Sequence, residues 1–387
     1  MGNLLFFIFA GLAVLTKGPL GILIPLLTVI LFLAFRRDLK FTLSGKFLAG
    51  FLIFCLIALP WYILMIKKYG RDFTHEFFYN DHWRRLMEAE HSANDRWYFY
   101  PLSAVGSMFP WSLYVVFAFV YLFKRFKTGV SSFELFLSCW IATGFLIFQP
   151  AHSKLISYIF PFFPALALLT GNYIFQGSQE EKSRSFFFIS LFTWVFLLSF
   201  PIGLIVAAHK FKHYFISFGP VYIFAGILFL YLLFLLFFML KRKWTIGIYF
   251  FSFLLPLFLF FAFWMHEDFD SFVSSKNVCS YLLQNYKVDS PILCSKFFVR
   301  GVRYYTDKEV AVIDVNGSGF FSPHPVPFLN TQDKVREFLF QHPTTYAILK
   351  KSVAREIQKT IGAEFSAEVL KVVGDEYIVR ITRKEVL

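Results

Sequence analysis

The stretch LYLLFLLFFML, residues 230–240, consists entirely of apolar and aromatic side chains. The run FFFIS at 186–190 has the same character, and the chain contains 57 Phe among its 387 residues. Only 16% of the residues are charged, whereas an average soluble domain has about 25%. No water-exposed surface carries runs of this kind. The composition excludes a disordered tail, a collagen, a coiled coil and an ordinary cytosolic enzyme, and it predicts a protein that lies mostly in a bilayer.

Apolar segments of this kind recur over the first two thirds of the chain. A transmembrane helix needs about 20 apolar residues, and shorter segments suffice if they tilt or pair. We therefore predict an α-helical multi-pass membrane protein with about nine transmembrane helices. The expected spans are 3–16, 20–35, 47–66, 103–123, 133–149, 155–175, 186–208, 215–240 and 245–264.

The basic residues gather at the ends of these segments. The formal net charge is +13 at pH 7, but this distribution is typical of membrane flanks, so we expect membrane lipids and no nucleic acid as partners. Lys and Arg in short loops favour the cytoplasm. The cytoplasmic loops are then 36–46, 124–127, 182–184 and 241–243. The outer face receives the turn at Lys17, the loop 67–102, the turn 150–154 and everything after Trp264.

From about His266 the composition becomes that of a soluble protein. Apolar stretches typical of strands alternate there with helical patterns. We predict a transmembrane domain over 1–265 and a small extracytoplasmic α/β domain over 266–387. The expected strands are 291–294, 309–315, 344–349 and 377–381, and the expected helices are 272–286, 331–341 and 351–361.

Two of the four cysteines, Cys279 and Cys294, lie in this external domain. They can pair in an oxidising compartment if their geometry allows it. The sequence leaves this pairing open. It leaves the oligomeric state open as well.

The loop 67–102 is too long for a plain connection and rich in aromatic residues. We expect short amphipathic helices along the membrane surface, in a loop that carries function. Its His82 and Arg85 are three residues apart and share a helix face. Histidines of this loop, His82 among them, together with its glutamates form a candidate site for a divalent metal ion. The alternative is that they face water and lipid headgroups.

A second polar group, His152-Ser153-Lys154, precedes a long apolar run. Lys154 is expected on the same membrane face as Lys17, Arg84 and Arg85, and these cations suit an outward-facing anion pocket of the kind a phosphate requires. Tyr158 lies one helical turn beyond Lys154 and can donate a hydrogen bond to the same anion. Snorkelling for Lys154 and an aromatic belt for Tyr158 are the alternatives.

Six motifs, taken in order, resemble those of one family. The resemblance is to the polyprenyl-phosphate-sugar glycosyltransferases of the GT-C fold, and within them most of all to the bacterial aminoarabinose lipid A transferases and their relatives, the protein O-mannosyltransferases. It covers about residues 1–265. The motifs are GLAVLTKGPLGILIP (11–25), ALPWY (58–62), EFFYNDHWRRL (76–86), RWYFYPL (96–102), FPWSL (109–113) and HSKLISYIFPFFPALALL (152–169).

The resemblance implies an enzyme of the inner membrane that takes a sugar from a polyprenyl phosphate on the outer, periplasmic face. The acceptor is expected to be lipid A, another lipid or a protein hydroxyl. By position in the family's motifs, Arg85, Tyr158 and Lys154 are expected to bind the carrier phosphate, with Arg84 beside them. His82 is a candidate metal ligand, although Asp81-His82 stands where His-Asn is common in the family.

The resemblance also implies about four further helices before Met1, and the family's catalytic Asp is expected in that upstream region. No acidic residue of the loop 67–102 takes its place convincingly. The chain is therefore expected to be a fragment, one half of a split enzyme that needs an N-terminal partner, or a non-catalytic remnant.

Two other hypotheses use the same residues. A transporter or flippase for a lipid-linked anion needs the outward cations, together with a polar path across the membrane. A membrane-anchored binding protein needs only the external domain.

Overall fold

The computed structural model describes residues 2–84, 87, 88, 94–179, 184–212, 217–267, 270, 274–315 and 326–384, without the side chains of 43 and 80–82. The chain divides into two compact units. The first comprises Met1–Val195 and Leu236–Ser252, and the second comprises Phe196–Leu235 and Phe253–Leu387. The first unit is helical, and the second contains the predicted α/β domain.

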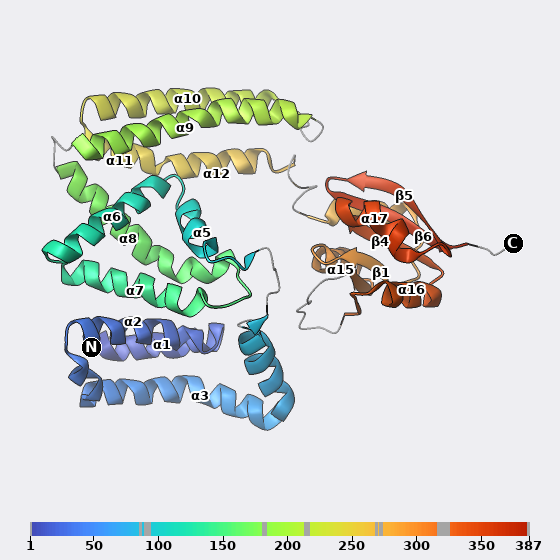
Figure 1. Ribbon diagram of the computed structural model, residues 1–387, viewed down its shortest axis with the longest axis horizontal. Helices are drawn as coiled ribbons and strands as arrows, with labels where there is room; N and C mark the ends of the chain where they lie inside the picture. Colours follow the sequence, from blue (N-terminus) through green and yellow to red (C-terminus); the bar gives the residue numbers. More distant parts are fainter. Residues whose placement is uncertain are drawn as a thin grey trace. The chain divides into compact units, whose positions relative to one another are not determined.

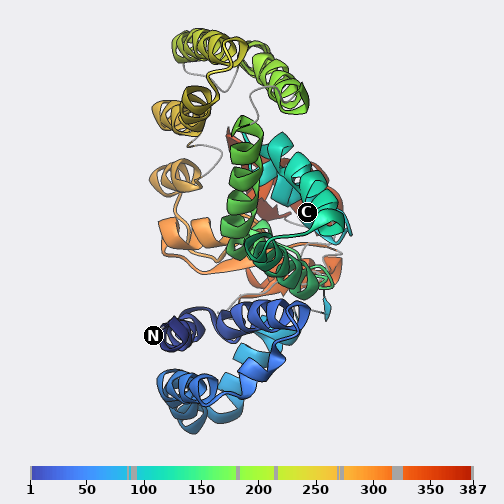
Figure 2. The ribbon, with the colours of Figure 1, turned by 90° about the vertical axis from the view of Figure 1, so that its left-hand side faces the viewer.

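Three apolar helices pack together at the N-terminus. α1 (Gly2–Lys17) contacts both α2 (Leu20–Phe35) and α3 (Gly45–Thr74), as Figures 1 and 2 show. Phe7 of α1 is fully buried in this contact. α3 continues to Thr74 and is followed by a π-helix, η2 (His75–Arg84), so the first half of the predicted outer loop is helical.

The helix predicted at 103–123 is broken. Two helices replace it, α5 (Phe99–Ser107) and α6 (Ser112–Thr128), and the chain bends by 117° between them. Pro110 lies in the break. Proline has no backbone N–H, and its ring disfavours the helical conformation of the preceding residue, so a straight helix does not pass through this position.

Three further segments complete the core of the first unit. They are α7 (Ser132–Phe148), the 3-10 segment η4 (Ile156–Phe162) and α8 (Phe163–Gln179). Fully buried side chains such as Tyr100, Phe162 and Leu166 join them to α5 and α6. The span predicted at 155–175 therefore begins as a tighter 3-10 helix, which contains Pro161.

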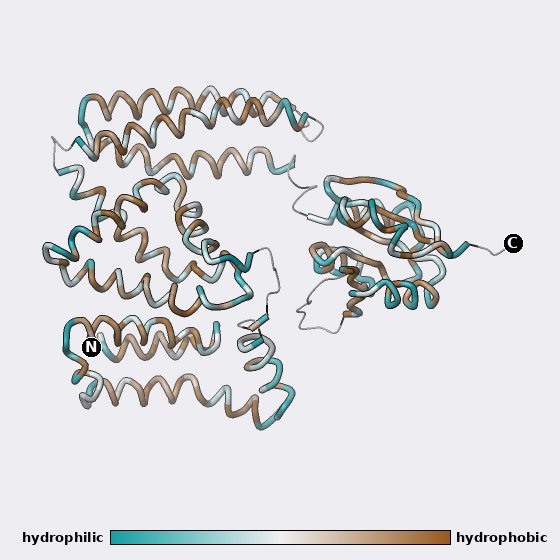
Figure 3. Tube along the Cα trace, in the orientation of Figure 1, coloured by the Kyte–Doolittle hydropathy of each residue, from teal (hydrophilic) through white to brown (hydrophobic). Residues whose placement is uncertain are grey.

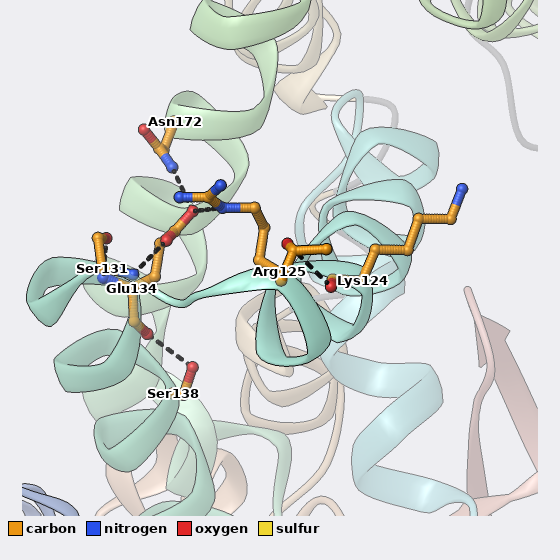
Figure 4. A network of polar contacts seen from close by, with 7 residues as sticks. Lys124, Arg125, Ser131, Glu134, Ser138 and Asn172 are labelled. Carbon is orange, nitrogen blue, oxygen red and sulfur yellow. Dashed lines mark hydrogen bonds and ion pairs between the residues drawn. The ribbon is translucent and has the colours of Figure 1, made fainter.

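A buried acidic residue lies where α6, α7 and α8 meet (Figure 4). Glu134, 2% exposed, forms a capping box with Ser131 at the start of α7. Its Oε1 lies 3.7 Å from Nε of Arg125 on α6 and accepts a 3.4 Å hydrogen bond from Nδ2 of Asn172 on α8. The carboxylate thus links three helices at one end of α7.

Long apolar helices follow along the chain: α9 (Arg184–Lys210), α10 (Gly219–Leu240), α11 (Trp244–Ser252) and α12 (Leu254–Trp264). Figure 3 shows the apolar colouring over most of their length. Among the described residues five helices are long and apolar enough to cross a membrane, or six if α5 and α6 form one bent span. α1, α2 and α7 are equally apolar but shorter. The chain is a multi-pass membrane protein, and the predicted number of about nine spans is not confirmed.

The predicted α/β domain is built on a six-stranded sheet with the order β3-β2-β1-β4-β6-β5. The first four strands in this order are parallel to one another. β6 pairs antiparallel with β4, and β5 pairs antiparallel with β6 at the edge of the sheet. The strands are β1 (Ile292–Ser295), β2 (Val310–Ile313), β3 (Phe328–Leu329), β4 (Thr344–Lys350), β5 (Phe365–Val373) and β6 (Glu376–Arg383).

Helices cover both faces of this sheet. The core on one face includes α16 (Gln332–Gln341) and α17 (Lys351–Ile361), and the core on the other includes α14 (Lys276–Asn285) and α15 (Val299–Thr306). The four predicted strands and three predicted helices are confirmed. β3, β5 and α15 were not predicted, because β3 has two residues and the edge strand β5 exposes polar side chains.

Cys279 and Cys294 are both free and fully buried in this domain. Burial raises the pKa of the Cys279 thiol to about 12 and raises that of Cys294 as well. Both thiols are therefore inert packing groups in this structure.

Candidate functional site

A cavity of about 900 Å³ opens within the first unit beside the turn that joins α1 to α2. Gly18 of this turn has φ 73°, a conformation that favours glycine, and the tight turn leaves Lys17 at the end of α1. Leu20 and Val29 of α2 both line the cavity. They are nine residues apart, so the cavity follows α2 for about 13 Å.

The walls of the cavity are mostly apolar. Ile24 and Val29 of α2, Phe136 and Trp140 of α7, and Trp83 of η2 all contribute to the lining. Polar side chains are few. Those that line the cavity are Lys17, Thr28, Ser153, Ser157 and Tyr158. A long apolar space with a cation and a few hydroxyl groups in its lining suits an amphiphile with an anionic head.

Tyr158 lines the cavity, although Lys154 precedes the helix that contains Tyr158 and is not one helical turn away as predicted. Tyr158 lies in η4 and stacks its ring on Phe148 at 5.4 Å between ring centres. Lys17 lines the same cavity from the opposite turn. The structure therefore brings together two of the groups that the sequence assigned to an anion pocket.

Lys154 has a different environment from the predicted one. Its side chain is 4% exposed and is not among the described residues that line the cavity. Its Nζ donates a 2.7 Å hydrogen bond to Oδ1 of Asp95. Nδ1 of His152 lies 2.7 Å from the other oxygen, Oδ2, of the same carboxylate. Asp95 thus binds both residues that flank Ser153.

Further bonds tie the segment 94–97 to the turn 149–154. Asn94 donates from Nδ2 to the carbonyl oxygen of Lys154, and Gln149 donates from Nε2 to the carbonyl oxygen of Trp97. The hydrogen bond from His152, and then that from Lys154, lowers the pKa of Asp95 below its ordinary value. The sequence missed the role of Asp95, since nothing local signals a partner 57 or 59 residues away.

The remaining predicted residues are only partly described. Arg84 of η2 pairs with Glu88, with 2.8 Å between Nε and Oε2. Arg85 and the side chain of His82 lie outside the described residues. Within the described part of the chain, no three His, Cys, Asp or Glu side chains gather as a metal site would require. The predicted metal site at His82 is therefore untested.

No protein-family model matches the chain. Two curated relatives are named undecaprenyl phosphate-alpha-4-amino-4-deoxy-L-arabinose arabinosyl transferases. The one from Sodalis glossinidius is 33% identical over 178 residues, which is 46% of this chain and 31% of the relative. The one from Proteus mirabilis is 33% identical over 177 residues, 45% of this chain and 31% of the relative. The match thus spans about a third of the length of these relatives.

The solved structures of ArnT from Cupriavidus metallidurans have the same fold. The form bound to undecaprenyl phosphate superposes with a TM-score of 0.65 at 18% identity, over 98% of this chain and 68% of that chain. The apo form superposes with a TM-score of 0.61 over 96% of this chain and 66% of that chain. This chain is thus similar in sequence, over nearly half its length, to curated undecaprenyl phosphate-aminoarabinose arabinosyl transferases, and it has the fold of the ArnT structures over nearly all of its length.

Proposed function

We propose that this protein is a membrane glycosyltransferase that transfers a sugar from a polyprenyl phosphate to lipid A or a similar acceptor. The observation that carries the proposal is the apolar cavity whose lining includes Lys17 and Tyr158. Its walls suit the isoprenoid chain of such a donor, and the cation and hydroxyl groups suit its phosphate. The names of the relatives and of the undecaprenyl phosphate complex point to the same donor.

The proposed topology has about nine spans in the inner membrane. α1, α2 and α7 are short but apolar and pack together, and such packing lets short helices cross a bilayer. The positive-inside rule supports the placement of the loop 67–102 and of the domain 266–387 on the periplasmic side. The proposal also places the boundary between the transmembrane domain and the external domain near residue 265.

The proposed phosphate ligands are Arg85, Arg84 and Tyr158, together with Lys17, which lines the same cavity as Tyr158. The pair between Arg84 and Glu88 is exposed, so a phosphate can compete with it at little cost. Lys154 contributes to the proposed site indirectly, because its Nζ donates a hydrogen bond to Asp95. The proposal also includes a divalent ion bound at His82 and an N-terminal half of the enzyme as a partner.

The chemistry requires charge stabilisation at the departing phosphate. The acceptor oxygen forms a bond to the anomeric carbon of the sugar, the bond from that carbon to the phosphate oxygen breaks, and the proton of a hydroxyl acceptor passes to the departing phosphate or to water. The bonding electrons stay with the polyprenyl phosphate, whose added negative charge the cations offset. The residue that organises the acceptor is unassigned.

Binding of undecaprenyl phosphate by the full chain tests this function. Trp83 and Trp140 line the cavity, so their fluorescence reports its occupation. We expect saturable binding that Lys17→Ala weakens about tenfold, the loss typical of one hydrogen bond to a charged group. Lys127→Ala, an exposed lysine in the last turn of α6, is the matched control and leaves binding unchanged. Absence of binding by the wild type contradicts the proposal.

Transfer assays separate the three hypotheses. Reconstituted protein with a labelled aminoarabinosyl donor and lipid A is expected to form labelled lipid A. Movement of the labelled donor across vesicles without transfer favours a flippase instead. Neither transfer nor movement, with a specific ligand for the external domain, favours the binding protein.

A further inference from the structure

Ser153 combines two properties that rarely occur together. It is 1% exposed, and within the described chain its Oγ has no hydrogen-bond partner. It also lines the apolar cavity beside Lys17 and Tyr158. A buried hydroxyl without a partner is unfavourable, and native proteins retain few of them without a reason. A ligand oxygen that reaches Ser153 from the cavity is one group that can supply the missing partner.

The two neighbours of Ser153 explain how it is held there. His152 and Lys154 both bind Asp95, each at 2.7 Å and each to a different carboxylate oxygen. Asn94 adds a hydrogen bond to the backbone of Lys154. The residues on both sides of Ser153 are therefore anchored, while its own hydroxyl has no partner within the described chain.

We propose that Ser153 donates a hydrogen bond to a phosphate oxygen of the polyprenyl-phosphate ligand and that Asp95 positions it by holding His152 and Lys154, an assignment that rests on the proposed function. The geometry favours a phosphate because Lys17 supplies a positive charge at the same cavity. Hydrogen bonds to charged acceptors are stronger than those to neutral ones. Ser153 is thus a specificity residue for the charged head of the ligand.

The test compares two ligands that differ only in the head group. Undecaprenyl phosphate and undecaprenol are titrated into the full chain in nanodiscs, with tryptophan fluorescence as the signal. Ser153→Ala is expected to weaken binding of the phosphate about tenfold and to leave binding of the alcohol within about twofold. The melting temperature of the ligand-free variant is expected to equal or exceed that of the wild type, because the substitution removes an unsatisfied group.

Thr170→Val is the matched control. Thr170 is also buried, but its Oγ1 donates to the carbonyl oxygen of Leu166 at 2.7 Å, and it is not among the described residues that line the cavity. This variant is expected to bind both ligands as the wild type does. Equal binding of the phosphate by wild type and Ser153→Ala overturns the role of Ser153 while the proposed function stands. A wild type that binds neither ligand overturns both.

Asp95→Asn tests the positioning step, because two models predict opposite signs. If Asp95 only neutralises the neighbouring cations, its loss of charge increases the affinity for phosphate. If Asp95 positions Ser153, the affinity falls, and the fall is much smaller when Ser153 is already Ala. An increase, or full additivity of the two substitutions, contradicts the positioning role. If the Asn variant does not fold, the result for Ser153→Ala decides alone.

Discussion

The two ends of α7 lie next to acidic clusters of different construction. At its start, Glu134 is part of the helix cap and contacts Arg125 and Asn172 at 3.7 and 3.4 Å. Beyond its end, Asp95 comes from a separate segment and contacts His152 and Lys154 at 2.7 Å each. The carboxylate of the first cluster is buried, and it joins three helices (Figure 4). In the second cluster the Asp95 side chain is 28% exposed, and its two partners flank Ser153, which lines the cavity.

The difference teaches how the fold divides its polar residues. A carboxylate within helix ends satisfies the backbone and its neighbours at once, which stabilises the bundle. A carboxylate that connects two loop segments fixes the position of the residues between its partners. We therefore expect changes at Glu134 to affect stability and changes around Asp95 to affect binding.

The largest expected effect is that of Glu134→Ala. The substitution removes the capping box and leaves Arg125 without its carboxylate, at a cost of about 3 kcal/mol. This is the low end for a broken buried pair, because the Arg125 side chain is 40% exposed. Unfolding of the purified protein monitored by circular dichroism measures the loss. Glu134→Gln is the control, because it keeps a side-chain acceptor at the cap. Equal stability of Glu134→Ala and wild type contradicts the stabilising role of Glu134.

Lys154→Met is the corresponding change at the other cluster. The apolar chain fills a similar volume, but Asp95 loses one charged hydrogen bond, so we expect a cost of about 2 kcal/mol. Phosphate binding is expected to fall as well, because the anchor on one side of Ser153 is lost. Unfolding and ligand titration on the same preparations measure both effects. A loss of stability with unchanged binding shows that this cluster works like the one at Glu134.

The pH dependence of stability distinguishes the clusters further. The pKa of Asp95 is lowered from its ordinary value of 3.8, mainly by the hydrogen bonds from His152 and Lys154. A lowered pKa stabilises the fold above the ordinary value, and this contribution disappears as the pH falls toward the lowered pKa. The difference in melting temperature between wild type and Asp95→Asn is therefore expected to shrink below about pH 4. A difference that grows in acid has the wrong sign for this ion pair.

The smallest expected effect is that of Asn172→Ala. Its hydrogen bond to Glu134 is long at 3.4 Å, so its loss is expected to cost about 0.5 kcal/mol, the low end for a hydrogen bond. Side-by-side melting curves with Glu134→Ala measure the ratio of the two effects. If Asn172→Ala costs as much stability as Glu134→Ala, the hydrogen bond from Asn172, and not the capping box, holds the three helices together.

The positions of the membrane helices could be predicted because apolar runs such as 230–240 exclude other structures by themselves. The strands at 291–294 and 344–349 were predictable for a similar reason, since both are nearly uninterrupted apolar runs. The bend at Pro110 was missed because the residues around it are as apolar as those of a straight span. β5 was missed because an edge strand buries few side chains and so leaves little pattern.

The candidate site was predictable only in part. Tyr158 was assigned from its motif and its spacing from Lys154, and it lines the cavity. Lys154 was assigned to the same anion, but its charge is bound by Asp95. The partner of a charged group depends on contacts between distant segments, which neither composition nor periodicity records.

The sequence by itself determined that this is a multi-pass membrane protein with an α/β domain, and its motifs indicated the similarity to the arabinosyl transferases, because local hydrophobicity and short motifs carry that information. Only the tertiary structure decided which polar groups meet. It placed Ser153 in the cavity and bound His152 and Lys154 to Asp95. Folding brings such groups together through packing over long sequence separations, where an unpaired charge is too costly to leave in place.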